Sequence, residues 1–153
     1  MDALLFELLP HIRQGHNCAQ LLHILAQQAA GEENASLLRA VRGLGHGIGH
    51  SGGPCGLLSG GATVLAWLAS PDASEPHPML DAMLNDYASW FMERTQRSGI
   101  SCDAIVQDLA AAAGQNVQNN DKPPLELCGD LLSQCWARIL ELAEAYQLER
   151  LGY

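Results

Sequence analysis

Apolar side chains recur at intervals of three and four residues through most of the chain, the pattern of helices with one buried face. Asparagine and serine precede several of these periodic stretches, and glycine or proline follows them, as expected at helix ends. No segment shows the two-residue alternation of a half-buried strand, and no internal repeat appears. The patterns therefore predict an all-α protein, with helices over residues 4–12, 17–31, 34–48, 55–69, 78–97, 101–113 and 125–148.

The segment that follows Pro54, CGLLSGGATVLAWLA, is apolar on almost every side and is too short to span a membrane. We expect it to be the buried central helix of a single-domain bundle of about six or seven helices over residues 1–153. A polar loop at 114–124 is expected before the last helix.

Composition narrows the class of protein. The 153 residues are 48% apolar, which suits one compact domain with a core. The formal net charge of -9, with only eight Lys and Arg, disfavours nucleic acid and anionic membranes as partners. The start MDALLFELLPHIR lacks the positive charge of a secretory signal, so we expect a cytoplasmic protein. Its five cysteines then point to metal binding or redox chemistry rather than to structural disulfides.

Four of the cysteines fall in or near the first turn of a predicted helix. A helix start offers unpaired N–H groups and a partial positive charge, which favour the thiolate and are expected to lower the thiol pKa. If these helix starts meet, they form one thiol-lined pocket that favours negative charge. The separations are long and no CxxC occurs, so core packing remains an alternative for each cysteine. The four are Cys18 after Asn17, Cys55 after Pro54, Cys102 after Ser101, and Cys128 shortly after Pro123 and Pro124.

The stretch GHGIGHSGGPCG places His46 and His50 four residues apart, the spacing that puts two imidazoles on one helical face. Both are candidates for alternative metal ligands or for hydrogen-bonding neighbours of a metal centre, as is His16, two residues before Cys18. An exposed histidine, or one paired within the protein, is the ordinary alternative. The other histidines, His11, His23 and His77, are interpreted as surface or helix-face residues, and no role is assigned to them.

The same stretch is rich in glycine, which weakens a helix unless the backbone must approach a neighbour closely, as between two helices packed around a cofactor. It matches GxGxxG by letters only, because no strand precedes it, so a phosphate or dinucleotide loop is excluded. Cys135 lies two helical turns after Cys128 and is expected in the core, with a reserve role as a ligand or disulfide partner.

Four segments carry a family resemblance: NCAQLL from Asn17, PCGLLSGG from Pro54, SCDAIV from Ser101 and LCGDLL from Leu127. Together they resemble the C_GCAxxG_C_C family of redox-active proteins, over about residues 17–146. GEENASLLRAVRGLGHGIG also resembles the helix that precedes the second cysteine in one branch of that family. In the second motif, Pro54 precedes the cysteine and Leu57 stands where a small residue is usual, while Gly60 matches the final glycine.

The resemblance implies a small helical protein with four characteristic cysteines. A related domain in split-Soret cytochromes is associated with an iron–sulfur cluster, so the resemblance makes Cys18, Cys55, Cys102 and Cys128 the candidate cluster and metal ligands. Cys128 matches the fourth motif cysteine better than Cys135 does.

We therefore expect an electron carrier with an iron–sulfur cluster, of the 2Fe-2S type, and no catalytic residue is assigned. Its acidic surface would favour a basic redox partner protein, and a homodimer is left open. The residues alone leave two alternative functions open. One is a metal-free thiol–disulfide protein with Cys55 as the attacking thiolate. The other is a zinc-stapled interaction module, because four thiolates suit zinc equally well.

Overall fold

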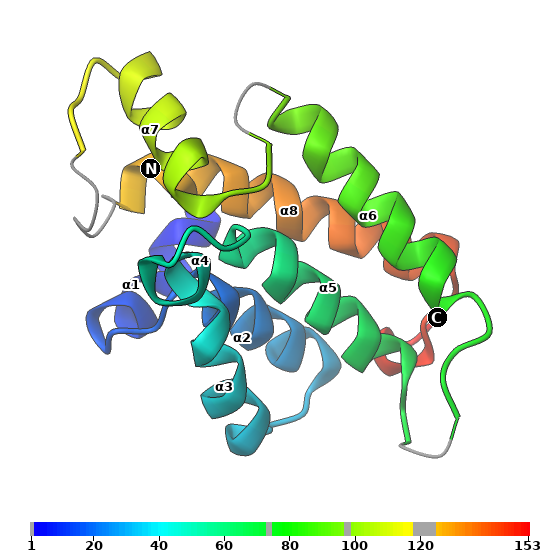
Figure 1. Ribbon diagram of the computed structural model, residues 1–153. Helices are drawn as coiled ribbons and strands as arrows, with labels where there is room; N and C mark the ends of the chain where they lie inside the picture. Colours follow the sequence, from blue (N-terminus) through cyan, green and yellow to red (C-terminus); the bar gives the residue numbers. More distant parts are fainter. Residues whose placement is uncertain (1, 73–74, 97–98, 118–124) are drawn as a thin grey trace.

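The computed structural model describes residues 2–72, 75–96, 99–117 and 125–153, and these residues form a helical bundle (Figure 1). Their only pairing of extended backbone is an isolated bridge between Pro54 and Ser101, so the predicted all-α class is confirmed. None of the described helices is long and apolar enough to cross a membrane. The elements are α1 (Ala3–Arg13), α2 (Cys18–Ala30), α3 (Ala35–Val41), η1 (Arg42–Leu44), α4 (Gly45–His50), α5 (Gly56–Ala69), α6 (Leu80–Arg94), α7 (Cys102–Ala112), α8 (Leu125–Ala145) and η2 (Glu149–Leu151).

Side-chain caps fix several helix starts where the sequence predicts them. Asn17 accepts a hydrogen bond from the Gln20 backbone N–H at 3.2 Å, and the Gln20 side chain accepts from the Asn17 N–H, which makes a capping box. The side chains of Asn34 and Ser101 cap α3 and α7 by accepting a single hydrogen bond each from a backbone N–H of the first turn. The predicted helix end at Arg97 and the loop prolines before α8 lie outside the described residues.

The central position predicted for the 55–69 segment is confirmed, because no residue of α5 is exposed. Figure 1 shows α5 running through the middle of the bundle, between α2 on one side and α6 and α8 on the other. Its glycines permit this close packing. A Cβ added to Gly60 would stand 2.7 Å from Ala19 Cα, and one added to Gly61 would overlap the hydroxyl of Tyr87.

The predicted helix over 34–48 is wrong in its last part. The right-handed helix ends with η1, and from His46 to His50 the backbone takes positive φ values, between 55° and 64°. Element α4 is thus a left-handed turn. Ile48, expected on a buried face, is 50% exposed. Alternate glycines permit this turn, since glycine adopts positive φ at little cost.

His23, for which a surface or helix-face position is expected, lies on the face of α2 that meets α5 and is fully buried there. The Thr63 hydroxyl donates its one proton to the Gly60 carbonyl at 2.8 Å, so its oxygen accepts from His23 Nε2, also at 2.8 Å. The other ring nitrogen, Nδ1, is buried without a hydrogen-bond partner. Burial lowers the His23 pKa to about 4, so the imidazole is neutral at pH 7.

Candidate cysteine site

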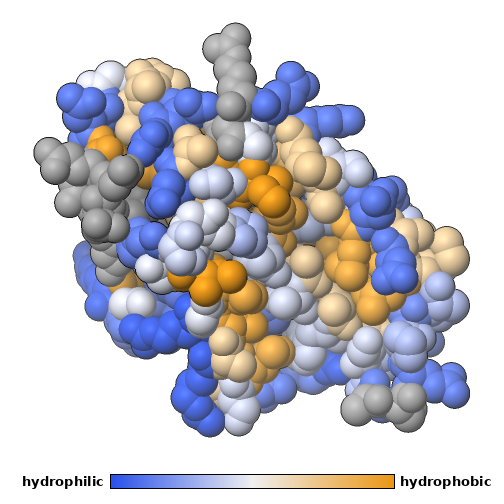
Figure 2. All heavy atoms as spheres, in the orientation of Figure 1, coloured by the Kyte–Doolittle hydropathy of each residue, from blue (hydrophilic) through white to orange (hydrophobic). Residues whose placement is uncertain are grey.

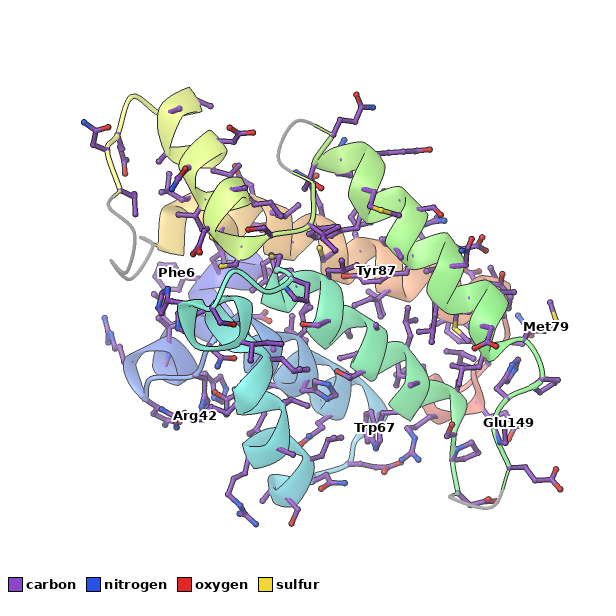
Figure 3. All side chains as sticks on the ribbon, in the orientation of Figure 1. Phe6, Arg42, Trp67, Met79, Tyr87 and Glu149 are labelled. Carbon is purple, nitrogen blue, oxygen red and sulfur yellow. The ribbon has the colours of Figure 1, made fainter. Side chains whose placement is uncertain are left out.

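The starts of four helices meet at one end of α5 and bring four thiols together. Cys18 is the first residue of α2, Cys55 directly precedes α5, Cys102 is the first residue of α7, and Cys128 lies in the first turn of α8. All four line one cavity of about 280 Å³, here called the cysteine cavity. Figure 3 shows sulfur atoms gathered in this region, where α5, α7 and α8 approach one another. The other lining residues are Ile12, His16, Asn17, Leu21, His46, Leu57, Ile105, Val106, Leu131 and Leu132.

Backbone hydrogen bonds hold together the two chain segments that carry Cys55 and Cys102. The Cys55 N–H donates to the Ile100 carbonyl at 2.6 Å, and the Cys102 N–H donates to the Gly53 carbonyl at 3.1 Å. These bonds belong to the bridge between Pro54 and Ser101, so the segments that lead into α5 and α7 are held together. Cys55 and Cys102 therefore line the cavity from two chain segments that backbone hydrogen bonds hold together.

The left-handed turn α4 closes over this pair. The Gly47 carbonyl accepts from the Gly53 N–H at 3.0 Å and from the Ser51 hydroxyl at 3.2 Å. A Cβ added to Gly47 would lie 2.9 Å from Cys102 Cβ, so only glycine fits against Cys102 at this position. The turn thus forms part of the wall beside Cys102.

The sulfur of Cys18 lies among backbone N–H groups. Those of His46 and Gly56, together with those of Ala19 and Cys18 itself, interact with the sulfur and favour its thiolate form. Gly56 approaches so closely that a Cβ there would stand 2.5 Å from the Cys18 sulfur. Groups arranged in this way stabilise negative charge on a sulfur atom.

The expected lowering of the thiol pKa values at the helix starts is wrong. Burial raises the pKa of Cys102 to about 11 and that of Cys128 to about 12. Burial, followed by the charge of Cys18, raises the pKa of Cys55 well above its ordinary value. Burial also raises the pKa of Cys18, although its backbone N–H groups oppose the shift. Loss of hydration thus outweighs the helix starts, and the four thiols hold their protons at pH 7.

The candidate histidines divide between the cavity and its outer side. His16 and His46 line the cavity, and His16 Nδ1 is buried without a hydrogen-bond partner. Burial lowers the pKa of His16. His50 is not among the lining residues, but its ring stacks on that of His46 with centroids 5.0 Å apart. His46 and His50 are therefore close together, as predicted. A left-handed turn brings them together, and not the shared face of a right-handed helix.

Cys135 does not line the cavity. It is fully buried beside Tyr87, whose hydroxyl donates to the Leu57 carbonyl at 2.6 Å. Because that hydroxyl proton is used, the Tyr87 oxygen is left to accept from the Cys135 thiol. Burial raises the pKa of Cys135 to about 12. Tyr87 had not been assigned a part near the site, and its regular place on an apolar helix face gave no sign of one.

All five cysteines are free thiols. Within the described residues, no three His, Cys, Asp or Glu side chains are arranged closely enough to hold a single metal ion. The described site is a cavity lined by four thiols.

Comparisons with known proteins give one family. A family model described as "Putative redox-active protein (C_GCAxxG_C_C)" matches residues 16–142, which include all four cavity cysteines. No curated protein matches the chain, and no solved structure does. Because the family model spans most of the sequence, the chain belongs to the C_GCAxxG_C_C family of redox-active proteins.

Proposed function

We propose that the cysteine cavity holds an iron–sulfur cluster, of the 2Fe-2S type, and that the protein exchanges single electrons with a partner protein. The observation that supports this is the meeting of Cys18, Cys55, Cys102 and Cys128 in one cavity. When bound, such a cluster supplies one-electron oxidation and reduction, and cysteine thiolates are its usual ligands.

The number and chemical type of the donors support a cluster. Four cysteines supply two ligands to each iron of a 2Fe-2S cluster, or one to each iron of a 4Fe-4S cluster, so three protein donors need not surround one ion. The chain supplies four such thiols, and they line one cavity of about 280 Å³. A zinc staple would instead need its four thiolates about 2.3 Å from a single ion.

The raised thiol pKa values and the backbone N–H groups near Cys18 determine how the chain would hold a cluster. Because burial raises the thiol pKa values, each ligand would release its proton when it binds a metal, and loading would be favoured by higher pH. The N–H groups around Cys18 would then hold an anionic sulfur. Apolar walls such as Leu57 and Leu131 would limit access of water. The alternative with Cys55 as an attacking thiolate is disfavoured, since the Cys55 pKa is raised well above its ordinary value.

The test is the visible absorption spectrum of protein purified without oxygen, with iron, sulfide and zinc measured on the same sample. Absorption bands between about 320 and 460 nm, with iron and sulfide in equal amounts, are expected for the cluster. Zinc alone would instead support a zinc staple. A colourless, metal-free protein whose free thiols increase on reduction would support thiol–disulfide chemistry, and either of these two results would overturn the proposal.

A further inference from the structure

The acidic residues of the chain avoid one long stretch. No Asp or Glu occurs between Asn34 and Pro71, although the chain has 17 of them in total. The same stretch carries Arg39, Arg42 and two histidines. Its exposed part is α3, η1 and α4, because α5 is covered by other helices. A strongly acidic protein thus exposes one segment, from α3 to α4, that carries only positive formal charges.

The η1 and α4 part of this segment lies directly against the cysteine cavity. Arg42, Gly43, His46, Ile48 and Gly49, here called the Arg42 face, line a shallow groove of about 440 Å³ together with Gly15, Asn17 and Gly45. His46 and Asn17 line both this groove and the cysteine cavity. One layer of side chains therefore separates the cavity from a molecule bound in the groove.

Arg42 is available for a partner of opposite charge. Its side chain is exposed, and no carboxylate of the described residues pairs with it. Figure 3 places Arg42 beside α1 and α3 at the edge of the bundle. On the other side of the cavity, Asp103 of α7 follows Cys102, so the positive part of the rim is the part formed by η1 and α4.

Ile48 gives the groove an apolar centre that folding does not explain. The side chain is 50% exposed, and its φ of 58° is a conformation that a β-branched residue strongly disfavours. In Figure 2, hydrophobic atoms reach the surface beside α4. An apolar centre with a polar rim is the usual composition of a protein docking site, and here Asn17, Arg42 and His46 supply the polar rim.

We propose that the Arg42 face docks an acidic redox protein, which exchanges electrons with the cysteine cavity past His46. The electron exchange in this proposal rests on the proposed function of the cysteine cavity. The docking of the partner does not depend on it. Attraction to Arg42 and repulsion by the remaining acidic surface would orient such a partner. This proposal differs from the basic partner that net charge alone would favour.

The test is a titration of the ¹⁵N-labelled protein, followed by NMR, with flavodoxin as an acidic probe and cytochrome c as a basic one. Flavodoxin is expected to shift the amide signals of Gly43, Gly45 and Gly49 at low salt, and to bind more weakly as salt rises. Arg42→Glu should weaken binding about tenfold or more, as expected for loss of electrostatic steering. Arg138→Glu, which makes the same change in net charge on α8, should leave it within about twofold.

A second variant separates binding from folding. Ile48→Gly should weaken flavodoxin binding while the free energy of unfolding stays equal or rises, because glycine tolerates the left-handed φ. Equal effects of Arg42→Glu and Arg138→Glu, or stronger binding of cytochrome c, or no shifts on the Arg42 face, would overturn the proposal. Binding in this assay requires no iron, so its failure is distinct from failure of the cluster proposal.

Discussion

Gly56, the first residue of α5, lies directly against the sulfur of Cys18 at the start of α2. A side-chain carbon at Gly56 would stand 2.5 Å from that sulfur, well inside van der Waals contact. The two helix starts are therefore held at a separation that only glycine permits. Close approach of the backbone at this point sets where one of the four thiols lies.

Gly56→Ala is expected to displace the Cys18 sulfur and to lower the iron bound per protein by more than half, measured after anaerobic reconstitution. Gly43→Ala is the control, because no atom lies within 4 Å of a Cβ at that position. Far-UV circular dichroism would show that both variants keep their helices. Full loading of Gly56→Ala would show that the cavity adapts to a displaced Cys18.

Serine in place of Cys18, Cys55, Cys102 or Cys128 should remove most of the visible absorption and iron, because serine is a much poorer ligand for these clusters. The matched control is Cys135→Ser. Its hydroxyl can still donate to the Tyr87 oxygen, and Cys135 lies outside the cavity lining, so loading should be retained. Loss of iron in Cys135→Ser, with retention in Cys128→Ser, would exchange the roles of these two residues.

The buried His23 should make stability depend on pH between its ordinary pKa of 6.5 and its folded value of about 4. In this window the unfolded chain binds the proton more readily, so the free energy of unfolding falls as the pH falls. The loss over the whole window is about 3 kcal/mol. Urea unfolding at pH 7, 5.5 and 4.5 would measure it.

His23→Gln is the control for this pH effect, since an amide can still donate to Thr63 but does not titrate. The variant should show a smaller loss of stability on acidification, with only the carboxylates contributing. Parallel pH profiles for the variant and the natural protein would exclude His23 as the cause.

The left-handed turn allows a paired test of backbone conformation against packing. Gly47 and Gly49 have φ values of 61° and 64°, so alanine at either position carries a similar conformational cost, about 1–2 kcal/mol. At Gly47 the added carbon would also lie 2.8 Å from the Gly53 carbonyl oxygen, while at Gly49 it meets open space. Gly47→Ala should thus lose about 1–3 kcal/mol more than Gly49→Ala in urea unfolding. Equal losses would show that α4 moves away from Cys102 freely.

Local features of this fold were predictable from the sequence. Asn17, Asn34 and Ser101 lie at helix starts because a short polar side chain can accept a hydrogen bond from the first turn, which depends on neighbouring residues alone. The all-α class and the burial of α5 followed from apolar periodicity in the same way.

Features that depend on distant segments were not predictable. The left-handed turn follows from hydrogen bonds between Gly47 and later residues, whereas Leu44 and Ile48 continue the spacing of a right-handed helix. The thiol pKa values were predicted from helix starts alone, but burial by other helices decides their direction. For His23, the available sign was its position between Leu22 and Ile24, within an apolar run.

The four thiols come from separate parts of the chain that meet only after folding, so an unfolded chain offers no equivalent site. If the cavity holds a cluster, assembly of the metal centre and folding are then one equilibrium. Each tenfold excess of the loading species over its dissociation constant would add about 1.4 kcal/mol to the folded state. In a cell short of iron, more molecules would be open to proteolysis, and the amount of this protein would follow the iron supply.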